Sequence, residues 1–284
     1  MRIRIAEEAG FCFGVQRALD IINRAKSEGK KLSTLGPIIH NPQVVEGLAR
    51  EGIESVDDLS EARTPYVVVR SHGVPPEIYE EAKSRGIEII DATCPFVKTA
   101  QDVAKLLASD GYQVVVVGKE YHPEVLGLVG HAGGKAIVVD EPSALKGLVF
   151  SRKVGVLAQT TMRYEIFAEV VSELLRKARE VRAFNTICYT TRRRQESTRE
   201  LARQVDLMIV VGGRNSSNTT RLYEICEDMG VPTHLIESPD EIDPKWLESV
   251  NEVGITAGAS TPPEVVEEVV ERLQAIGRVK EGIT

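Results

Sequence analysis

Three cysteines occur in the same local setting, and this repetition restricts the fold more than any other feature of the sequence. Each follows a short apolar run and opens a segment with helical periodicity; the three are Cys12, Cys94 and Cys188. A polar residue lies 28 positions after each cysteine and four positions after a glycine that ends an apolar run; these are His40, His122 and Ser216. Such repetition indicates three units built to one plan.

A further polar loop completes each unit. These loops follow another apolar run and contain His72, Thr160 with Thr161, and Ser260. Ligand sites of open α/β sheets form at the carboxyl ends of the strands. We therefore expect the polar loops of the three units to converge on one site.

Short β-branched runs alternate with helical patterns along the chain. Strands are predicted over 66–70, 88–91, 113–117, 136–139, 154–157 and 207–211, and helices over 95–107, 164–179, 192–203 and 263–276. Continuous apolar strands between helices are typical of parallel sheets covered on both faces. We predict an α/β protein of three small domains with mainly parallel sheets, in a pseudo-threefold arrangement around a central site. The predicted units are 13–94, 95–188 and 189–284, the last completed by the N-terminal strand within 1–12.

Composition restricts the partners and the compartment. The net charge of -7 argues against nucleic acid and anionic membranes as partners, because both require a basic face. No apolar run reaches the length of a membrane span, and the first residues lack the apolar core of a signal peptide. We expect a cytoplasmic protein, in which structural disulfides are disfavoured.

The three repeated cysteines are candidate metal ligands. A helix start favours the thiolate, which is the form that binds metal. Structural zinc sites and iron–sulfur clusters usually take four protein ligands, so three cysteines leave one metal position open for a substrate. Zinc and an iron–sulfur cluster both fit at this point. The fourth cysteine, Cys226, lies in a helical pattern and is expected to be a buried apolar residue.

The polar loops supply a donor-rich set without an obvious lysine or arginine clamp. Imidazoles, hydroxyls and loop amides can bind a phosphate or diphosphate. Each such residue could instead be a turn residue or a helix cap, as Asn218 could be for the helix that follows it. Glu124 is either a proton donor in a closed pocket or an exposed glutamate in the first turn of a helix.

The ordered motifs resemble the 4-hydroxy-3-methylbut-2-enyl diphosphate reductase family. The resemblance runs from about Ile5 to Pro262 and rests on GFCFGVQRA, GPIIHNPQVVE, VRSHGV, DATCPFV, YHPEVLG, AQTT, ICYTTRRRQ, GGRNSSNTTRL and GAS. One departure is Thr190, where the family commonly has alanine. This difference concerns the fine shape of the pocket beside Thr191.

The resemblance implies a reductase with one [4Fe–4S] cluster held by Cys12, Cys94 and Cys188, which makes the central site an iron–sulfur site. The substrate diphosphate would lie among His40, His72, His122, Thr160, Ser216, Ser217, Asn218 and Ser260. Glu124 would deliver protons. Two electrons from a ferredoxin or flavodoxin and two protons would remove the substrate hydroxyl, giving isopentenyl and dimethylallyl diphosphate as the last step of the methylerythritol phosphate route to isoprenoids.

Three other functions remain open on the sequence alone. An iron–sulfur hydro-lyase would use the open iron without net electrons. A non-catalytic iron–sulfur sensor would need the cysteines but not Glu124. A zinc protein would use the same thiolates without iron.

Overall fold

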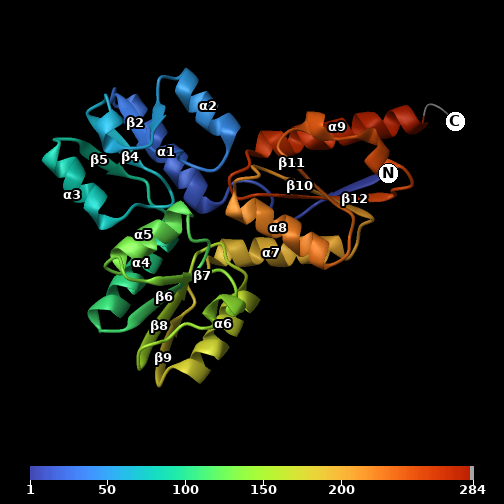
Figure 1. The fold of residues 1–284 in the computed structure, drawn as a ribbon. Helices are drawn as coiled ribbons and strands as arrows, with labels where there is room; N and C mark the ends of the chain where they lie inside the picture. The colour runs from blue at the N-terminus through green and yellow to red at the C-terminus, as the bar shows by residue number, and fades with distance from the viewer. Residues whose placement is uncertain (282–284) are drawn as a thin grey trace. The chain divides into compact units, whose positions relative to one another are not determined.

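The structure is a computed structural model that describes residues 1–281, in which strands and helices alternate (Figure 1). The chain divides into two compact units. Unit 1 consists of Met1–Phe13, His40–Val44 and Tyr189–Thr284, and unit 2 consists of Gly14–Ile39 and Val45–Cys188.

Unit 2 contains two parallel sheets of four strands each. The first has the order β3-β2-β4-β5 and is formed by β2 (Leu32–Leu35), β3 (Glu54–Val56), β4 (Tyr66–Val69) and β5 (Glu88–Asp91). The second has the order β7-β6-β8-β9 and is formed by β6 (Gln113–Val117), β7 (Ile137–Val139), β8 (Lys153–Ala158) and β9 (Glu180–Phe184). In each sheet the chain changes its direction of travel between the two central strands. Ligands of open α/β sheets bind at such points, at the carboxyl ends of the strands.

Unit 1 contains a third parallel sheet with the corresponding order β11-β10-β12-β1. Its strands are β1 (Arg2–Ile5), β10 (Leu207–Val211), β11 (Thr233–Ile236) and β12 (Glu252–Ala257). The outer position held by β5 and β9 in the other two sheets is held here by β1, which pairs with β12 from Arg2 opposite Glu252 to Ile5 opposite Ile255.

Helices connect the strands and cover the sheets. They are α1 (Phe13–Ser27), α2 (Pro42–Arg50), α3 (Pro76–Ser84), α4 (Pro95–Ser109), α5 (Pro123–His131), α6 (Tyr164–Lys177), α7 (Tyr189–Ala202), α8 (Ser217–Asp228) and α9 (Pro263–Glu281). In unit 1, α9 lies on one face of the sheet and α7 and α8 lie on the other (Figure 1). None of the described helices combines the length and the apolar character needed to cross a membrane.

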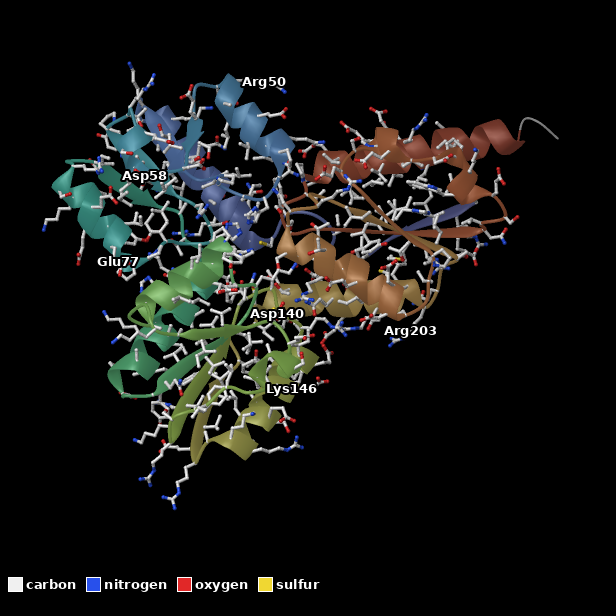
Figure 2. All side chains as sticks on the ribbon, viewed as in Figure 1. Arg50, Asp58, Glu77, Asp140, Lys146 and Arg203 are labelled. Carbon is white, nitrogen blue, oxygen red and sulfur yellow. The ribbon has the colours of Figure 1, made fainter. Side chains whose placement is uncertain are left out.

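The central strands are apolar because both of their faces are buried. Val67, Val68 and Val69 of β4 are fully buried, as are all five residues of β10 within a few percent. Many charged residues lie on the surface: the side chains labelled in Figure 2 (Arg50, Asp58, Glu77, Asp140, Lys146 and Arg203) are all exposed. This distribution confirms the predicted α/β fold class with three parallel sheets.

Three glycines show that the sheets share one plan in detail. Each directly follows one of the two central strands of its sheet (β2, β6 or β10), and its N–H donates to the carbonyl of the last residue of the neighbouring outer strand. The three bonds are Gly36 to Val56 at 2.7 Å, Gly118 to Val139 at 2.8 Å and Gly212 to Ile236 at 2.9 Å. The repeat read from the sequence is therefore repeated in the backbone hydrogen bonds. The domain boundaries at the cysteines stay a prediction.

Most predicted elements agree with the structure within a few residues. The main difference is α7, which begins at Tyr189 and not at Arg192. Its first turn is the polar stretch YTTR, which has no apolar periodicity to mark a helix start. As a result the helix starts directly after Cys188, as helices also start directly after Cys12 and Cys94.

Candidate active site

Each of the three repeated cysteines is fixed through its backbone to the loop that follows a central strand. The N–H of the cysteine donates to a carbonyl two residues beyond the end of β4, β8 or β12. The bonds join Cys94 to Ser71 at 3.0 Å, Cys188 to Thr160 at 2.9 Å and Cys12 to Ala259 at 3.1 Å. Each cysteine therefore lies beside a predicted substrate residue, because His72 follows Ser71, Ser260 follows Ala259, and Thr160 is itself one.

The donor set suits a metal with soft ligands. Cys12, Cys94 and Cys188 are half-buried, and the structure describes all four cysteines without a disulfide bond between any of them. Cys226 differs from the other three: it is fully buried in an apolar cluster of unit 1, and burial raises the pKa of its thiol to about 12. Its predicted role as a core residue is confirmed. The three half-buried thiols at helix starts are the ones suited to bind a metal as thiolates.

Glu124 lies in the first turn of α5 but is only 1% exposed, so the interpretation of an exposed helix-start glutamate is wrong. Thr160 holds both carboxyl oxygens: its N–H is 2.6 Å from Oε1, and its hydroxyl is 2.8 Å from Oε2. Burial raises the pKa of Glu124 to about 7, although both Thr160 hydrogen bonds act to lower it. The carboxyl group can therefore carry a proton near neutral pH.

Two imidazoles lie together in unit 2. The rings of His72 and His122 are 5.3 Å apart between centroids and nearly perpendicular. His122 caps α5, because its Nδ1 accepts the N–H of Glu124 at 3.1 Å. Since Nδ1 acts as the acceptor, a neutral His122 carries its proton on Nε2. His122 is thus both a helix cap and a possible donor to a ligand, and the same hydrogen bond ties it to Glu124.

In unit 1, the start of α8 carries Ser216, Ser217 and Asn218, all buried. The N-cap is Ser216, whose hydroxyl accepts the N–H of Thr219, so the interpretation of Asn218 as the cap is wrong. Neither amide atom of Asn218 has a hydrogen-bond partner among the described residues. A buried amide without partners is costly, so it indicates a ligand that completes the site.

His40 and Ser260 meet this same region of unit 1. The hydroxyl of Ser260 donates to the carbonyl of His40 at 3.3 Å. A Cβ on Gly213, in the loop before Ser216, would lie 3.0 Å from the same carbonyl. Unit 1 therefore brings His40, Ser260 and the start of α8 together. Cys12 joins them through its bond to Ala259, the residue before Ser260.

The predicted site residues are divided between the units as follows. Unit 2 holds Cys94, Cys188, His72, His122, Glu124 and Thr160, and unit 1 holds Cys12, His40, Ser216, Ser217, Asn218 and Ser260.

Sequence reasoning missed residues that position the site. Gln159 accepts the N–H of Lys119 at 3.1 Å and donates to Thr161 at 2.9 Å, so it joins the loops after β6 and β8. Asp91 accepts the N–H of Thr93 at 2.9 Å in the turn before Cys94. Gln159 lies in the motif AQTT directly before Thr160, and Asp91 lies in the motif DATC three residues before Cys94.

The fold and the site together define a class of α/β protein in which three parallel sheets carry cysteines, hydroxyls, imidazoles and a buried acid at their strand ends. A family model described as LytB protein matches residues 3–274. The chain belongs to this family, which confirms the resemblance seen in the motifs.

Curated relatives match the whole chain. One is the 4-hydroxy-3-methylbut-2-enyl diphosphate reductase of Pelobacter propionicus, 49% identical over 278 residues that cover 98% of this chain and 99% of that relative. Another is the protein of the same name from Geobacter metallireducens, 48% identical over 280 residues and covering 99% of both chains.

Two solved structures are also similar over nearly the full length. One is an (E)-4-hydroxy-3-methyl-but-2-enyl diphosphate reductase, 44% identical with a TM-score of 0.71, covering 97% of this chain and 100% of that one. The other is the E-1-hydroxy-2-methyl-but-2-enyl-4-diphosphate reductase from Plasmodium falciparum, 29% identical with a TM-score of 0.90, covering 95% of this chain and 87% of that one.

Proposed function

We propose that this protein is an oxidoreductase that removes the hydroxyl group of 4-hydroxy-3-methylbut-2-enyl diphosphate with two electrons and two protons, giving isopentenyl and dimethylallyl diphosphate. The observation that carries the proposal is identity of nearly half over the full length to proteins named for this reductase activity. The chemistry of the candidate site supports it.

Cys12, Cys94 and Cys188 would hold one [4Fe–4S] cluster. They are half-buried and lie at helix starts, whereas Cys226 is buried and lies in the last turn of α8. When bound, such a cluster supplies the electrons and the Lewis acidity that side chains lack. The electrons would come from a ferredoxin or flavodoxin, and a cytoplasmic location fits such a partner. No nucleic-acid or membrane partner is proposed.

The diphosphate would be bound by neutral donors rather than by a cationic clamp. His40, Ser216, Ser217, Asn218 and Ser260 would contribute from unit 1, and His72, His122 and Thr160 from unit 2. The start of α8 adds backbone N–H groups and the positive end of the helix dipole. Asn218 would gain the hydrogen-bond partners that its buried amide lacks among the described residues.

Glu124 would donate the protons. Hydroxide is a poor leaving group, so its departure as water requires a proton donor. With a pKa of about 7, Glu124 is close to half protonated at neutral pH, whereas a carboxyl with an ordinary value would be almost fully ionised. Thr160 fixes the direction of both carboxyl oxygens.

The test is anaerobic turnover of the diphosphate substrate by the reconstituted protein, with and without a low-potential reductant. The proposal predicts both products only when reductant is present. Turnover without reductant would indicate the hydro-lyase instead, and a bound cluster without turnover would indicate the sensor. A Glu124→Gln variant that keeps its cluster and retains near-normal rates would remove Glu124 from the mechanism.

A further inference from the structure

The buried face of α7 is polar where a helix packed on a sheet is normally apolar. The buried residues of this helix begin with Thr191, Arg194, Gln195 and Thr198, and the apolar Leu201 follows only near its end. Burying polar groups is unfavourable unless they make hydrogen bonds, so the polar face indicates a specific set of partners in unit 1.

Arg194 is the central residue of this face and is only 2% exposed. Its Nη1 donates to two backbone carbonyls, one of Glu8 and one of Ala257, the latter at 2.9 Å. Ala257 is the last residue of β12, and Glu8 lies in the turn that follows β1. Arg194 therefore joins the carboxyl ends of two neighbouring strands through a single guanidinium group.

Two neighbours on α7 strengthen the same connection. The hydroxyl of Ser197 accepts the N–H of Glu7 at 2.9 Å, and the hydroxyls of Thr198 and Thr256 are 2.8 Å apart. Residues 194–198 of α7 thus hold both the segment after β1 and the end of β12.

The two segments held by Arg194 lead directly to the site. Glu8 is four residues before Cys12, and Ala257 is three residues before Ser260. Beyond Arg194 the segments meet again, because the N–H of Cys12 donates to Ala259 at 3.1 Å. Ser260 then reaches the carbonyl of His40. The position of Cys12 relative to Ser260 therefore depends on where the two segments are held at Arg194.

We propose that Arg194 is a positioning residue that sets Cys12 relative to Ser260 in unit 1. It acts through the two carbonyls that it holds. The roles of Cys12 as a cluster ligand and of Ser260 as a diphosphate donor rest on the proposed function. The placement of Cys12 by Arg194 does not rest on the proposed function, so it can be tested without cluster or substrate.

The test measures the alkylation rate of each cysteine by peptide mass spectrometry in the folded apoprotein. Arg194→Met removes both hydrogen bonds, and we expect alkylation of Cys12 to become about tenfold faster. Arg194→Lys keeps the charge but replaces the planar fork by a single amine, so its rate should lie between those of Arg194→Met and the wild type. Cys94 and Cys188 lie in unit 2 and serve as internal controls with unchanged rates.

Leu201→Ala is the matched control for a merely structural effect. Leu201 lies on the same helix, is 8% exposed and packs in the apolar cluster of unit 1 without contributing to the carbonyl bonds. Leu201→Ala should lower the melting temperature and leave the alkylation rate of Cys12 unchanged. The proposal would be overturned if Leu201→Ala accelerated alkylation of Cys12 as much as an Arg194 variant with the same loss of melting temperature. It would also be overturned if the alkylation rate of Cys12 were unchanged in both Arg194 variants.

A second measurement uses the reconstituted enzyme. We expect Arg194→Lys to lose iron to a chelator faster than the wild type. We also expect a rise in the KM for the diphosphate substrate that is larger, as a fold-change, than the fall in kcat. If the wild-type protein bound no cluster, the proposed function would fail while the alkylation result still decided the role of Arg194. A normal KM and normal iron retention in a variant with reactive Cys12 would contradict the link between the two segments.

Discussion

Replacing Glu124 by glutamine should remove a pH dependence of folding stability that belongs to this one carboxyl group. Burial raises the pKa of Glu124 to about 7 from an ordinary value of 4.5. The folded protein therefore binds this proton more tightly than the unfolded chain does. The stabilisation is complete below about pH 4.5 and is lost as the pH rises to about 7, because the buried group must then ionise.

The size of the effect follows from the two values. Each pH unit between the two pKa values corresponds to about 1.4 kcal/mol, so ionisation of Glu124 lowers the free energy of unfolding by roughly 3 kcal/mol. Most of that cost falls between about pH 5 and about pH 8, where we expect the wild type to lose about 2 kcal/mol or more relative to Glu124→Gln. Other groups titrate equally in both proteins, so they cancel in this difference.

The assay is urea unfolding of the two apoproteins, followed by far-ultraviolet circular dichroism at several pH values. The difference in free energy between wild type and Glu124→Gln should change in favour of the variant as the pH rises, and become constant above about pH 8. Parallel pH curves for the two proteins would refute a buried, protonated Glu124. A wild type that gains stability over the variant with rising pH would refute the sign of the pKa shift.

Further expected outcomes concern other residues of the site. Cys94→Ser should lose the cluster, whereas Cys226→Ser should keep the iron content of the wild type; loss of iron in Cys226→Ser would refute the choice of ligands. Asn218→Ala should raise the KM for the diphosphate substrate about tenfold with little change in melting temperature, because its amide has no partner within the described residues to lose. A large fall in melting temperature would contradict this account. Gly118→Ala should lower stability by about 1–3 kcal/mol in thermal unfolding, since its Cβ would lie 2.7 Å from Val125 of α5; unchanged stability would show that the loop yields freely.

Much of the fold follows from local patterns in the sequence. β4, β6 and β10 are predicted well because their β-branched residues are buried on both faces and leave no polar position to confuse the pattern. The cysteine repeat also predicts the helix starts after Cys12, Cys94 and Cys188. Hydrophobic periodicity alone places the start of α7 three residues late, at Arg192, because the polar first turn carries no hydrophobic signal.

The site depends more on contacts between distant segments. The sequence leaves Glu124 equally suited to an exposed helix start or a closed pocket, and only the packing around α5 decides its burial. Arg192, Arg193 and Arg194 form one run, yet only Arg194 is buried, because successive helical residues point in different directions. The backbone hydrogen bonds that join each cysteine to the loop of a neighbouring strand cannot be predicted from the sequence either, because such bonds do not depend on side-chain identity.

The most direct test of the account is anaerobic analysis of iron and acid-labile sulfide per chain in the purified or reconstituted protein. The account predicts the stoichiometry of one [4Fe–4S] cluster, which falls sharply when Cys12, Cys94 or Cys188 is replaced by serine. Zinc in place of iron, or an iron and sulfide content that is unchanged in all three variants, would contradict the claim that these cysteines hold a cluster.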